Sequence, residues 1–284
     1  MKAVILAAGT ASRLRPLTLH TPKCLLKVGQ RTLLQRSMDA LIAAGIREFV
    51  IVTGYLHEQI EDFVRQTYGK LLLDEVSSLP LSEGRGGSFC FIHNKDYETT
   101  NNIYSLWLAQ PEAEGQDILL LDSDLLYDPQ IVERVLADKH ENVLTLIRHE
   151  LGEEEMKVVM DAEGRITEIS KTCDPALAAG ESLGIERMGK AYTTNLYKEL
   201  WEMMNKEASP DLHPALSGGE NRGGAPSPLE RDGVRLSFYE LAFQRLIAKG
   251  QTFSVLDVTD LFSCELDTVE DFENAKERIP AHLF

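Results

Sequence analysis

The residues best suited to chemistry lie at the start of the chain. An apolar run, residues 3–6, leads into Ala7-Ala8-Gly9-Thr10, and Arg13 and Lys23 follow after short gaps. Small residues after a buried strand let backbone N–H groups approach anionic oxygens, while Arg supplies forked donors and Lys a point charge. The first 38 residues contain seven Lys or Arg and no Asp or Glu, although the whole chain has a formal charge of −16. We therefore predict a nucleoside triphosphate site at this end.

Two pairs of carboxylates could supply the metal ion that a triphosphate needs. Asp122 and Asp124 close the apolar run 118–121, and Glu265 and Asp267 repeat the same spacing near the end of the chain. Residues two apart on a strand point to one face, and Mg²⁺ prefers one or two carboxylates completed by water and phosphate oxygens. Taken alone, either pair also fits a solvated strand end or a helix N-cap. The basic loop upstream favours the magnesium interpretation.

Several other functions are disfavoured by composition and spacing. The loop has one glycine and no following GK[ST], so it is neither a dinucleotide fingerprint nor a Walker A loop. Residues 39–284 carry all 45 acidic residues against 22 basic ones, which argues against a nucleic-acid partner. We expect a cytoplasmic protein without a membrane partner, because no signal peptide or long apolar stretch is present. The spacing of its four cysteines does not fit a metal site; they are Cys24, Cys90, Cys173 and Cys264.

Short apolar runs alternate with helical patterns over the first half of the chain. This alternation predicts an α/β fold with a mostly parallel twisted sheet flanked by helices. Ligands of such sheets lie at the carboxyl ends of strands, and residues 7–15, 54–55 and 122–124 each follow a strand-like run directly. Strands are predicted at 49–52, 88–93, 117–121 and 142–147, with helices at 33–44, 57–68, 102–109 and 129–136.

The second half of the chain differs from the first in composition and in its predicted elements. Residues 157–160 and 165–169 predict a hairpin with an acidic turn, a small antiparallel region on the acceptor side. Residues 206–234 are rich in Gly, Pro and Ser and predict a flexible surface insertion, with a lid over the site as the alternative. We predict one domain over 1–284, with a nucleotide-binding half at 1–150 and an acceptor-binding half at 151–284. A helix is predicted at 238–248, strands at 253–258 and 262–266, and a last helix at 269–278.

The opening motif resembles that of the nucleotidyltransferases, which join a nucleoside triphosphate to a sugar phosphate or small phosphorylated alcohol. The resemblance covers 6–14, then 16–18 and 21–23, with 120–124 and 265–267 similar to the family's two metal segments. It implies a Rossmann-like nucleotidyltransferase fold and Mg²⁺ held by Asp124, Glu265 and Asp267. Arg13 and Lys23 would be catalytic beside Asp124. Ala11 stands where the family usually has a second glycine.

Within that family, residues 96–107 resemble a segment of the CTP-using phosphocholine and aminoethylphosphonate cytidylyltransferases. By this resemblance Asn102 and Ser105 lie near the nucleotide, and Lys171 contacts an acceptor phosphate oxygen. The predicted nucleotide-binding set is Leu6, Ala7, Ala8, Gly9, Thr10, Arg13, Lys23, Gly54, Tyr55, Asn102 and Ser105.

The acceptor is less well defined by the sequence. Tyr192, and Tyr239 with Glu240, are candidates for binding its amine end. Tyr104 and Trp107 lie three apart on a predicted helix and could face a quaternary ammonium, although core packing is the preferred interpretation. Met156 stands where phosphocholine enzymes carry an aromatic residue, which argues against choline and leaves aminoethylphosphonate or another small phosphorylated alcohol open.

The expected reaction is attack of the acceptor anion on the α-phosphorus of CTP, with pyrophosphate leaving in line. The acceptor is already ionised, so alignment and charge stabilisation suffice. Three alternatives stay open: a sugar-1-phosphate nucleotidyltransferase using UTP, dTTP or GTP, a regulatory nucleotide-binding module, and a non-enzymatic interaction domain. A homodimer is one assembly that the sequence allows.

Overall fold

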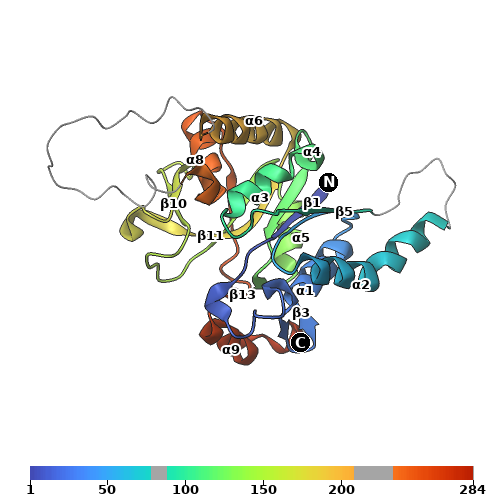
Figure 1. Cartoon of the computed structure of the whole chain (residues 1–284). Helices are drawn as coiled ribbons and strands as arrows, with labels where there is room; N and C mark the ends of the chain where they lie inside the picture. Colours follow the sequence, from blue (N-terminus) through green and yellow to red (C-terminus); the bar gives the residue numbers. More distant parts are fainter. Residues whose placement is uncertain (78–87, 208–232, 284) are drawn as a thin grey trace, which may run out of the picture.

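A nine-stranded mixed sheet lies at the centre of the computed structural model, which describes residues 1–77, 88–207 and 233–283 (Figure 1). The order along the main path is β10-β9-β11-β6-β1-β4-β5, and β8 joins β11 to β12. The predicted α/β fold is confirmed, while most of the predicted insertion 206–234 lies outside the described residues. The strands are β1 Lys2–Ala7, β2 Lys27–Val28, β3 Arg31–Thr32, β4 Glu48–Thr53, β5 Ser88–His93, β6 Ile118–Asp122, β7 Leu125–Tyr127, β8 Val143–Ile147, β9 Lys157–Met160, β10 Ile166–Ser170, β11 Ala178–Met188, β12 Ser254–Asp257 and β13 Ser263–Glu265.

Four parallel strands bring three loops to one edge of the sheet. Strand β1 pairs in parallel with both β4 and β6, and its last residues Leu6 and Ala7 lie opposite Asp122 and Thr53. The loops that follow β1, β4 and β6 therefore leave the sheet at neighbouring positions. This register confirms the expectation that the polar segments 7–15, 54–55 and 122–124 share one edge.

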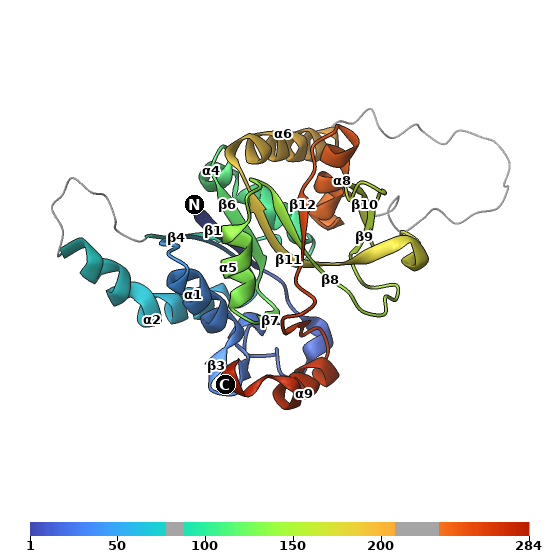
Figure 2. The same ribbon diagram turned by 180° about the vertical axis from the view of Figure 1, so that it is seen from behind.

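Helices cover both faces of the sheet (Figures 1 and 2). Alternate residues of β1 enter different cores, because successive strand residues point to opposite faces. Val4 and Leu6 pack with residues of α3, α6 and α8, whereas Ala3 and Ile5 pack with residues of α1, α2 and α5. The helices are α1 Leu33–Ala43, α2 His57–Ser77, α3 Asn102–Leu108, α4 Gln110–Ala113, α5 Gln130–Ala137, α6 Lys190–Glu207, α8 Glu240–Ala248 and α9 Val269–Arg278.

Strand β11 and helix α6 were absent from the sequence prediction. Strand β11 runs antiparallel to β6, β8 and β9 and so connects the two halves of the sheet. Its sequence contains Glu186 and Arg187, which are typical of a surface segment, yet both are buried. The Arg187 guanidinium donates to the carbonyls of Val135 and Asp138 at 2.9 and 3.0 Å, which satisfies a charge that composition alone places in solvent.

A smaller unit closes the carboxyl edge of the sheet. Strands β7 and β13 pair antiparallel, and α9 follows β13 directly. Leu14 and Leu26 from the basic segment pack with Leu266 and Phe272 in a third core cluster. Figures 1 and 2 both show α9 beside the first part of the chain, so the two ends of the sequence meet at the same side. Within the described ranges, no helix has the length and apolar character needed to cross a bilayer.

Candidate active site

A cavity of about 560 Å³ lies at the carboxyl edge of the sheet. It is lined by predicted residues from both halves of the chain, namely Leu6, Ala8, Arg13, Asn102, Ser105, Asp124, Lys171, Glu240, Glu265 and Asp267. A second cavity of about 640 Å³ shares Lys171, Glu265 and Asp267 with it, so the two are parts of one cleft. The structure therefore brings together the basic loop, both carboxylate pairs and part of the predicted acceptor set.

Gly54 and Tyr55 support the loop after β1 and are not among the cavity-lining residues. The Tyr55 N–H donates to the Ala8 carbonyl at 3.0 Å. A Cβ on Gly54 would lie 2.6 Å from that same carbonyl oxygen, so only glycine allows the two loops to approach this closely. Ala7, Gly9 and Thr10 are likewise absent from the cavity lining, although they belong to the loop that shapes it.

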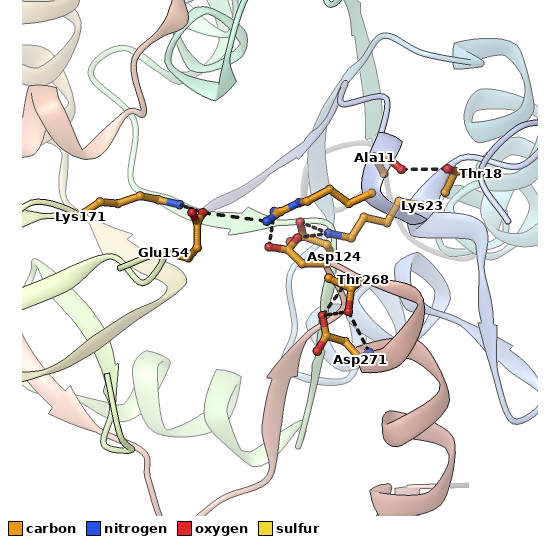
Figure 3. Close-up of polar contacts among 10 residues, drawn as sticks. Ala11, Thr18, Lys23, Asp124, Glu154, Lys171, Thr268 and Asp271 are labelled. Carbon is orange, nitrogen blue, oxygen red and sulfur yellow. Dashed lines mark hydrogen bonds and ion pairs between the residues drawn. The ribbon is translucent and has the colours of Figure 1, made fainter. Parts of the chain in front are cut away.

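Ala11 adopts a left-handed backbone conformation, with φ 46° and ψ 51°. Its carbonyl accepts from the Thr18 hydroxyl at 2.9 Å (Figure 3) and from the Leu14 N–H at 3.1 Å. Thr18 is fully buried, which fixes this turn against the protein. The alanine thus keeps the backbone shape that a glycine at this position would favour, and the loop geometry does not require the missing glycine.

This conformation predicts that Ala11→Gly stabilises the protein. A left-handed alanine costs roughly 1 kcal/mol, which is partly offset by the greater chain entropy of glycine when unfolded. We expect the free energy of unfolding in urea to rise by up to about 1 kcal/mol. Ala7→Gly, at the end of β1, should instead lower it by about 1 kcal/mol. Equal losses in the two variants would contradict the left-handed assignment.

Lys23 joins the two distant carboxylate pairs. Its Nζ donates to Asp124 Oδ2 at 2.8 Å and to Asp267 Oδ1 at 2.7 Å, across 101 and 244 residues of sequence (Figure 3). Arg13 Nη2 donates to Asp267 Oδ2 at 2.5 Å. Burial lowers the pKa of Lys23, but the charges of Asp124 and Asp267 outweigh it and raise that pKa above its usual range. Lys23 is therefore the cation that the two carboxylates share, and Arg13 contacts one of them.

Strand pairing and a helix cap explain why these carboxylates converge. Glu265 lies opposite Leu125 in the β13–β7 pair, so residues just beyond each strand are neighbours. The N-cap of α9 is Thr268, whose hydroxyl accepts from the Asp271 N–H at 3.1 Å while the Asp271 carboxylate accepts from the Thr268 N–H at 2.8 Å (Figure 3). This capping box frees Asp267, which the sequence also allowed as a cap, to face the cleft.

The carboxylates in the cleft fit a divalent cation. Within the described residues no group of three His, Cys, Asp or Glu is already gathered as a ligand set. Mg²⁺, however, needs one or two carboxylates, and Asp124 and Asp267 already share one cationic nitrogen. Loss of water contact and then the charges of Asp124, Glu181, Asp122 and Asp267 raise the pKa of Glu265 well above its usual range. A cation there would relieve this repulsion.

Asp122 has a different role from Asp124. Burial, followed by the charges of Asp124 and Glu240, raises the pKa of Asp122 well above its usual range. Its Oδ2 accepts from the Tyr239 hydroxyl at 2.9 Å, so Tyr239 contacts the site through Asp122 and is not a lining residue itself. The Tyr239 N–H also donates to Asn102 Oδ1 at 2.9 Å. The Ser105 hydroxyl, which lines the cavity, accepts from the Asn94 amide at 3.2 Å.

Tyr192 lies in the hydrophobic core and the structure does not bring it to the cleft. Its ring centroid is 4.7 Å from that of Phe253, and the residue is 3% exposed. Tyr104 also lies in this core and stacks on Trp107 with centroids 5.4 Å apart, as the preferred interpretation of that pair expects. Met156, by contrast, does line the cavity.

Glu240 is a buried carboxylate in the cavity wall. The residue is 6% exposed, burial raises its pKa to about 7, and its Oε2 has no hydrogen-bond partner among the described residues. The folded state therefore binds this proton more tightly than the unfolded state does. As a result, stability is lost as the pH rises from about 4.5 to about 7.

Replacing the Glu240 carboxyl group should remove this loss of stability at higher pH. In Glu240→Gln, the free energy of unfolding relative to the native sequence should increase by up to about 3 kcal/mol as the pH rises through this window. Urea unfolding at a series of pH values measures the difference. Parallel pH profiles for the two proteins would contradict the raised pKa.

Glu154 was missed as a site residue. Its Oε2 lies 4.0 Å from Arg13 Nη1 and 3.9 Å from Lys171 Nζ, so one carboxylate stands between two predicted anion-binding cations (Figure 3). Four Glu occur in residues 150–155, and this local acidity was the only signal in the sequence. Glu181 was also missed; it lines the cavity and pairs with His149 at 2.6 Å.

Comparison with known proteins identifies the family. The sequence model of the nucleotidyl transferase family matches residues 2–171, and the chain belongs to this family. Among its relatives is the CMP-5'-(3-aminopropyl)phosphonate synthase of Streptomyces rubellomurinus, 29% identical over 98% of this chain and 38% of the relative. The choline-phosphate cytidylyltransferase of Streptococcus pneumoniae is 35% identical over 44% of this chain and 46% of the relative. The 2-aminoethylphosphonate cytidylyltransferase of Lancefieldella rimae is 28% identical over 49% of this chain and 45% of the relative. The chain thus spans less than half the length of these relatives.

Solved structures show the same fold. The CTP:phosphocholine cytidylyltransferase of Streptococcus pneumoniae superposes with a TM-score of 0.69 at 19% identity, covering 98% of this chain and 99% of the other. The inositol-1-phosphate CTP transferase of T. maritima superposes with a TM-score of 0.61 at 21% identity, covering 99% of this chain and 97% of the other. The fold of this member of the nucleotidyl transferase family is therefore shared with these solved structures, and its relatives by sequence include cytidylyltransferases.

Proposed function

We propose that the protein is a Mg²⁺-dependent cytidylyltransferase that transfers CMP from CTP to a small phosphorylated or phosphono alcohol and releases pyrophosphate. The acceptor is of the 2-aminoethylphosphonate or phosphocholine type. The single observation that carries the proposal is the meeting of Arg13 and Lys23 with Asp124 and Asp267 at one end of a cleft whose other wall carries Lys171 and Glu240. The names of the relatives support cytidylyl transfer to phosphorylated or phosphono amines.

In this mechanism the protein aligns two anions and stabilises charge. Asp124, Asp267 and Glu265 would hold Mg²⁺, which supplies Lewis-acid neutralisation of phosphate oxygens when bound. Arg13 and Lys23 bind the triphosphate and stabilise the charge that develops on the leaving pyrophosphate. Lys171 binds the acceptor anion and directs it toward the α-phosphorus. Asn102 and Ser105 shape the nucleotide wall, and Glu240 faces the amine end of the acceptor.

A panel of substrates tests this proposal. The protein is incubated with Mg²⁺, each of CTP, UTP, dTTP and GTP, and each of 2-aminoethylphosphonate, phosphocholine, inositol phosphate and glucose 1-phosphate. New anhydride resonances in ³¹P NMR, with equimolar pyrophosphate, should appear with CTP and the phosphorylated or phosphono amines. Turnover confined to UTP, dTTP or GTP with glucose 1-phosphate would replace the proposal by the sugar-nucleotide alternative. Nucleotide binding without any turnover would favour a regulatory module.

A further inference from the structure

Lys157 is a buried cation behind the acceptor side of the cleft. The residue is 1% exposed and is the first residue of β9. Its ammonium donates to three backbone carbonyls, those of Lys171 at 2.7 Å, Glu155 at 3.2 Å and Glu153 at 3.4 Å. An ammonium has three N–H donors, so these contacts use its full capacity.

The three carbonyls belong to two neighbouring segments that both contribute to the cleft lining. One is Lys171, just after β10, and the other is the acidic loop, residues 150–155. Glu154, which lies between the two bonded loop residues, is the residue whose carboxylate stands 3.9 Å from the Lys171 ammonium (Figure 3). Lys157 therefore links the two segments through their backbone carbonyls, while the Lys171 and Glu154 side chains link them through an ion pair.

The charge of Lys157 is not needed for tethering alone. A neutral donor could bind carbonyls, and a buried charge without a counterion is costly. Among the residues that the structure describes, Lys157 has no carboxylate partner, and only carbonyl dipoles compensate it. Its positive charge therefore adds to that of Lys171 and favours an anion on this side of a cleft whose walls are otherwise rich in carboxylates.

We propose that Lys157 is a positioning residue for the acceptor anion. It fixes the separation of Lys171 and the acidic loop, so that an anionic group enters between Lys171 and Arg13 and takes the place of the Glu154 carboxylate. The chemical class of the ligand rests on the proposed function. The positioning role itself concerns any phosphonate or phosphate monoanion or dianion and is testable without turnover.

A double-mutant cycle with a direct binding readout tests this role. Binding of methylphosphonate is followed by ³¹P NMR, and CTP binding is measured separately by calorimetry. Lys157→Met keeps the length of the side chain but removes its donors and charge. We expect methylphosphonate to bind about 10-fold more weakly to this variant, a loss typical of charged hydrogen-bond networks, with unchanged CTP affinity. In a Lys171→Met background the same substitution should have little further effect, because both act through one contact.

Two further variants sharpen the result. Glu154→Gln should tighten methylphosphonate binding about threefold, because it removes the competing carboxylate of an exposed ion pair. Lys157→Gln keeps N–H donors without the charge, so its methylphosphonate affinity should fall between those of Lys157→Met and the native protein. If Lys157→Met does not unfold cooperatively, Lys157→Gln replaces it in the double-mutant cycle.

Additive effects of Lys157 and Lys171 substitutions, or an equal loss of CTP and methylphosphonate affinity, would show a purely structural lysine and overturn the proposal. Absence of turnover with every acceptor would overturn the proposed function but would leave this binding result as it stands.

Discussion

Asp124→Asn should lower the rate of nucleotidyl transfer by about 10³-fold while the protein stays folded. Asp124 lines the cleft and accepts directly from Lys23 at 2.8 Å, as Asp267 does at 2.7 Å, so it connects the strand end after β6 to the basic loop. Asparagine has the same shape but lacks the negative charge that a divalent cation requires. The measurement is pyrophosphate release from CTP at saturating Mg²⁺ and acceptor.

The fold should tolerate this change. Lys23 keeps its contact with Asp267 at 2.7 Å, so its buried ammonium is not left without a partner. We expect the free energy of unfolding to change by less than about 1 kcal/mol. Asp161→Asn is a matched control, because this aspartate pairs with Arg165 at 2.7 Å on the turn between β9 and β10 and does not line the cavity. Appreciable activity in Asp124→Asn would remove Asp124 from the metal site.

Lys23→Met should destabilise the metal-free protein and make its stability depend on Mg²⁺. Lys23 is the shared donor of Asp124 and Asp267, and its side chain is 12% exposed. Its removal leaves two partly buried carboxylates facing each other, which we expect to cost about 2 kcal/mol, the partial exposure of the aspartates keeping the loss below that of a fully buried pair. Transfer activity should also fall by about 10²-fold, because the triphosphate loses a point charge.

Added Mg²⁺ provides the discriminating measurement for this variant. A divalent ion can replace the ammonium between the two carboxylates, so Mg²⁺ should raise the melting temperature of Lys23→Met more than that of the native protein. Lys2→Met is the control: Lys2 pairs with Glu112 at 3.0 Å at the opposite end of β1, and its loss should not make stability depend on Mg²⁺. An equal Mg²⁺ response in all three proteins would place the cation elsewhere.

The sequence predicted much of the site because local patterns encode strand ends. The apolar run before Ala7 and the run before Asp122 are parallel neighbours in which Leu6 lies opposite Asp122, so the polar residues after them had to share an edge. The helices and strands of the first half follow the predicted ranges closely for the same reason. Extension of the helix at 57–68 to Ser77 is the main difference there.

Other parts depended on contacts that no local pattern carries. Strand β11 contains charged residues that are buried only because distant carbonyls accept from Arg187. Helix α6 is a different case, because Leu196, Leu200 and Met203 have helical spacing and are buried, so a local signal for it was present in the sequence. Tyr192 was placed with the acceptor because of its residue type, whereas its ring packs against Phe253 in the core. The Glu154 carboxylate lies between Arg13 and Lys171 because its loop is fixed by carbonyls that accept from Lys157.

The amino-acid sequence by itself determined the class of fold and the groups available for chemistry, since apolar periodicity and charge are local properties of the chain. Tertiary structure alone decided which of those groups act together. Lys23 reaches Asp267 across 244 residues because β7 pairs with β13 and Thr268 caps α9 in place of Asp267. Whether a carboxylate faces a cation, a helix end or solvent is a matter of distance in space, and chain order does not specify that distance.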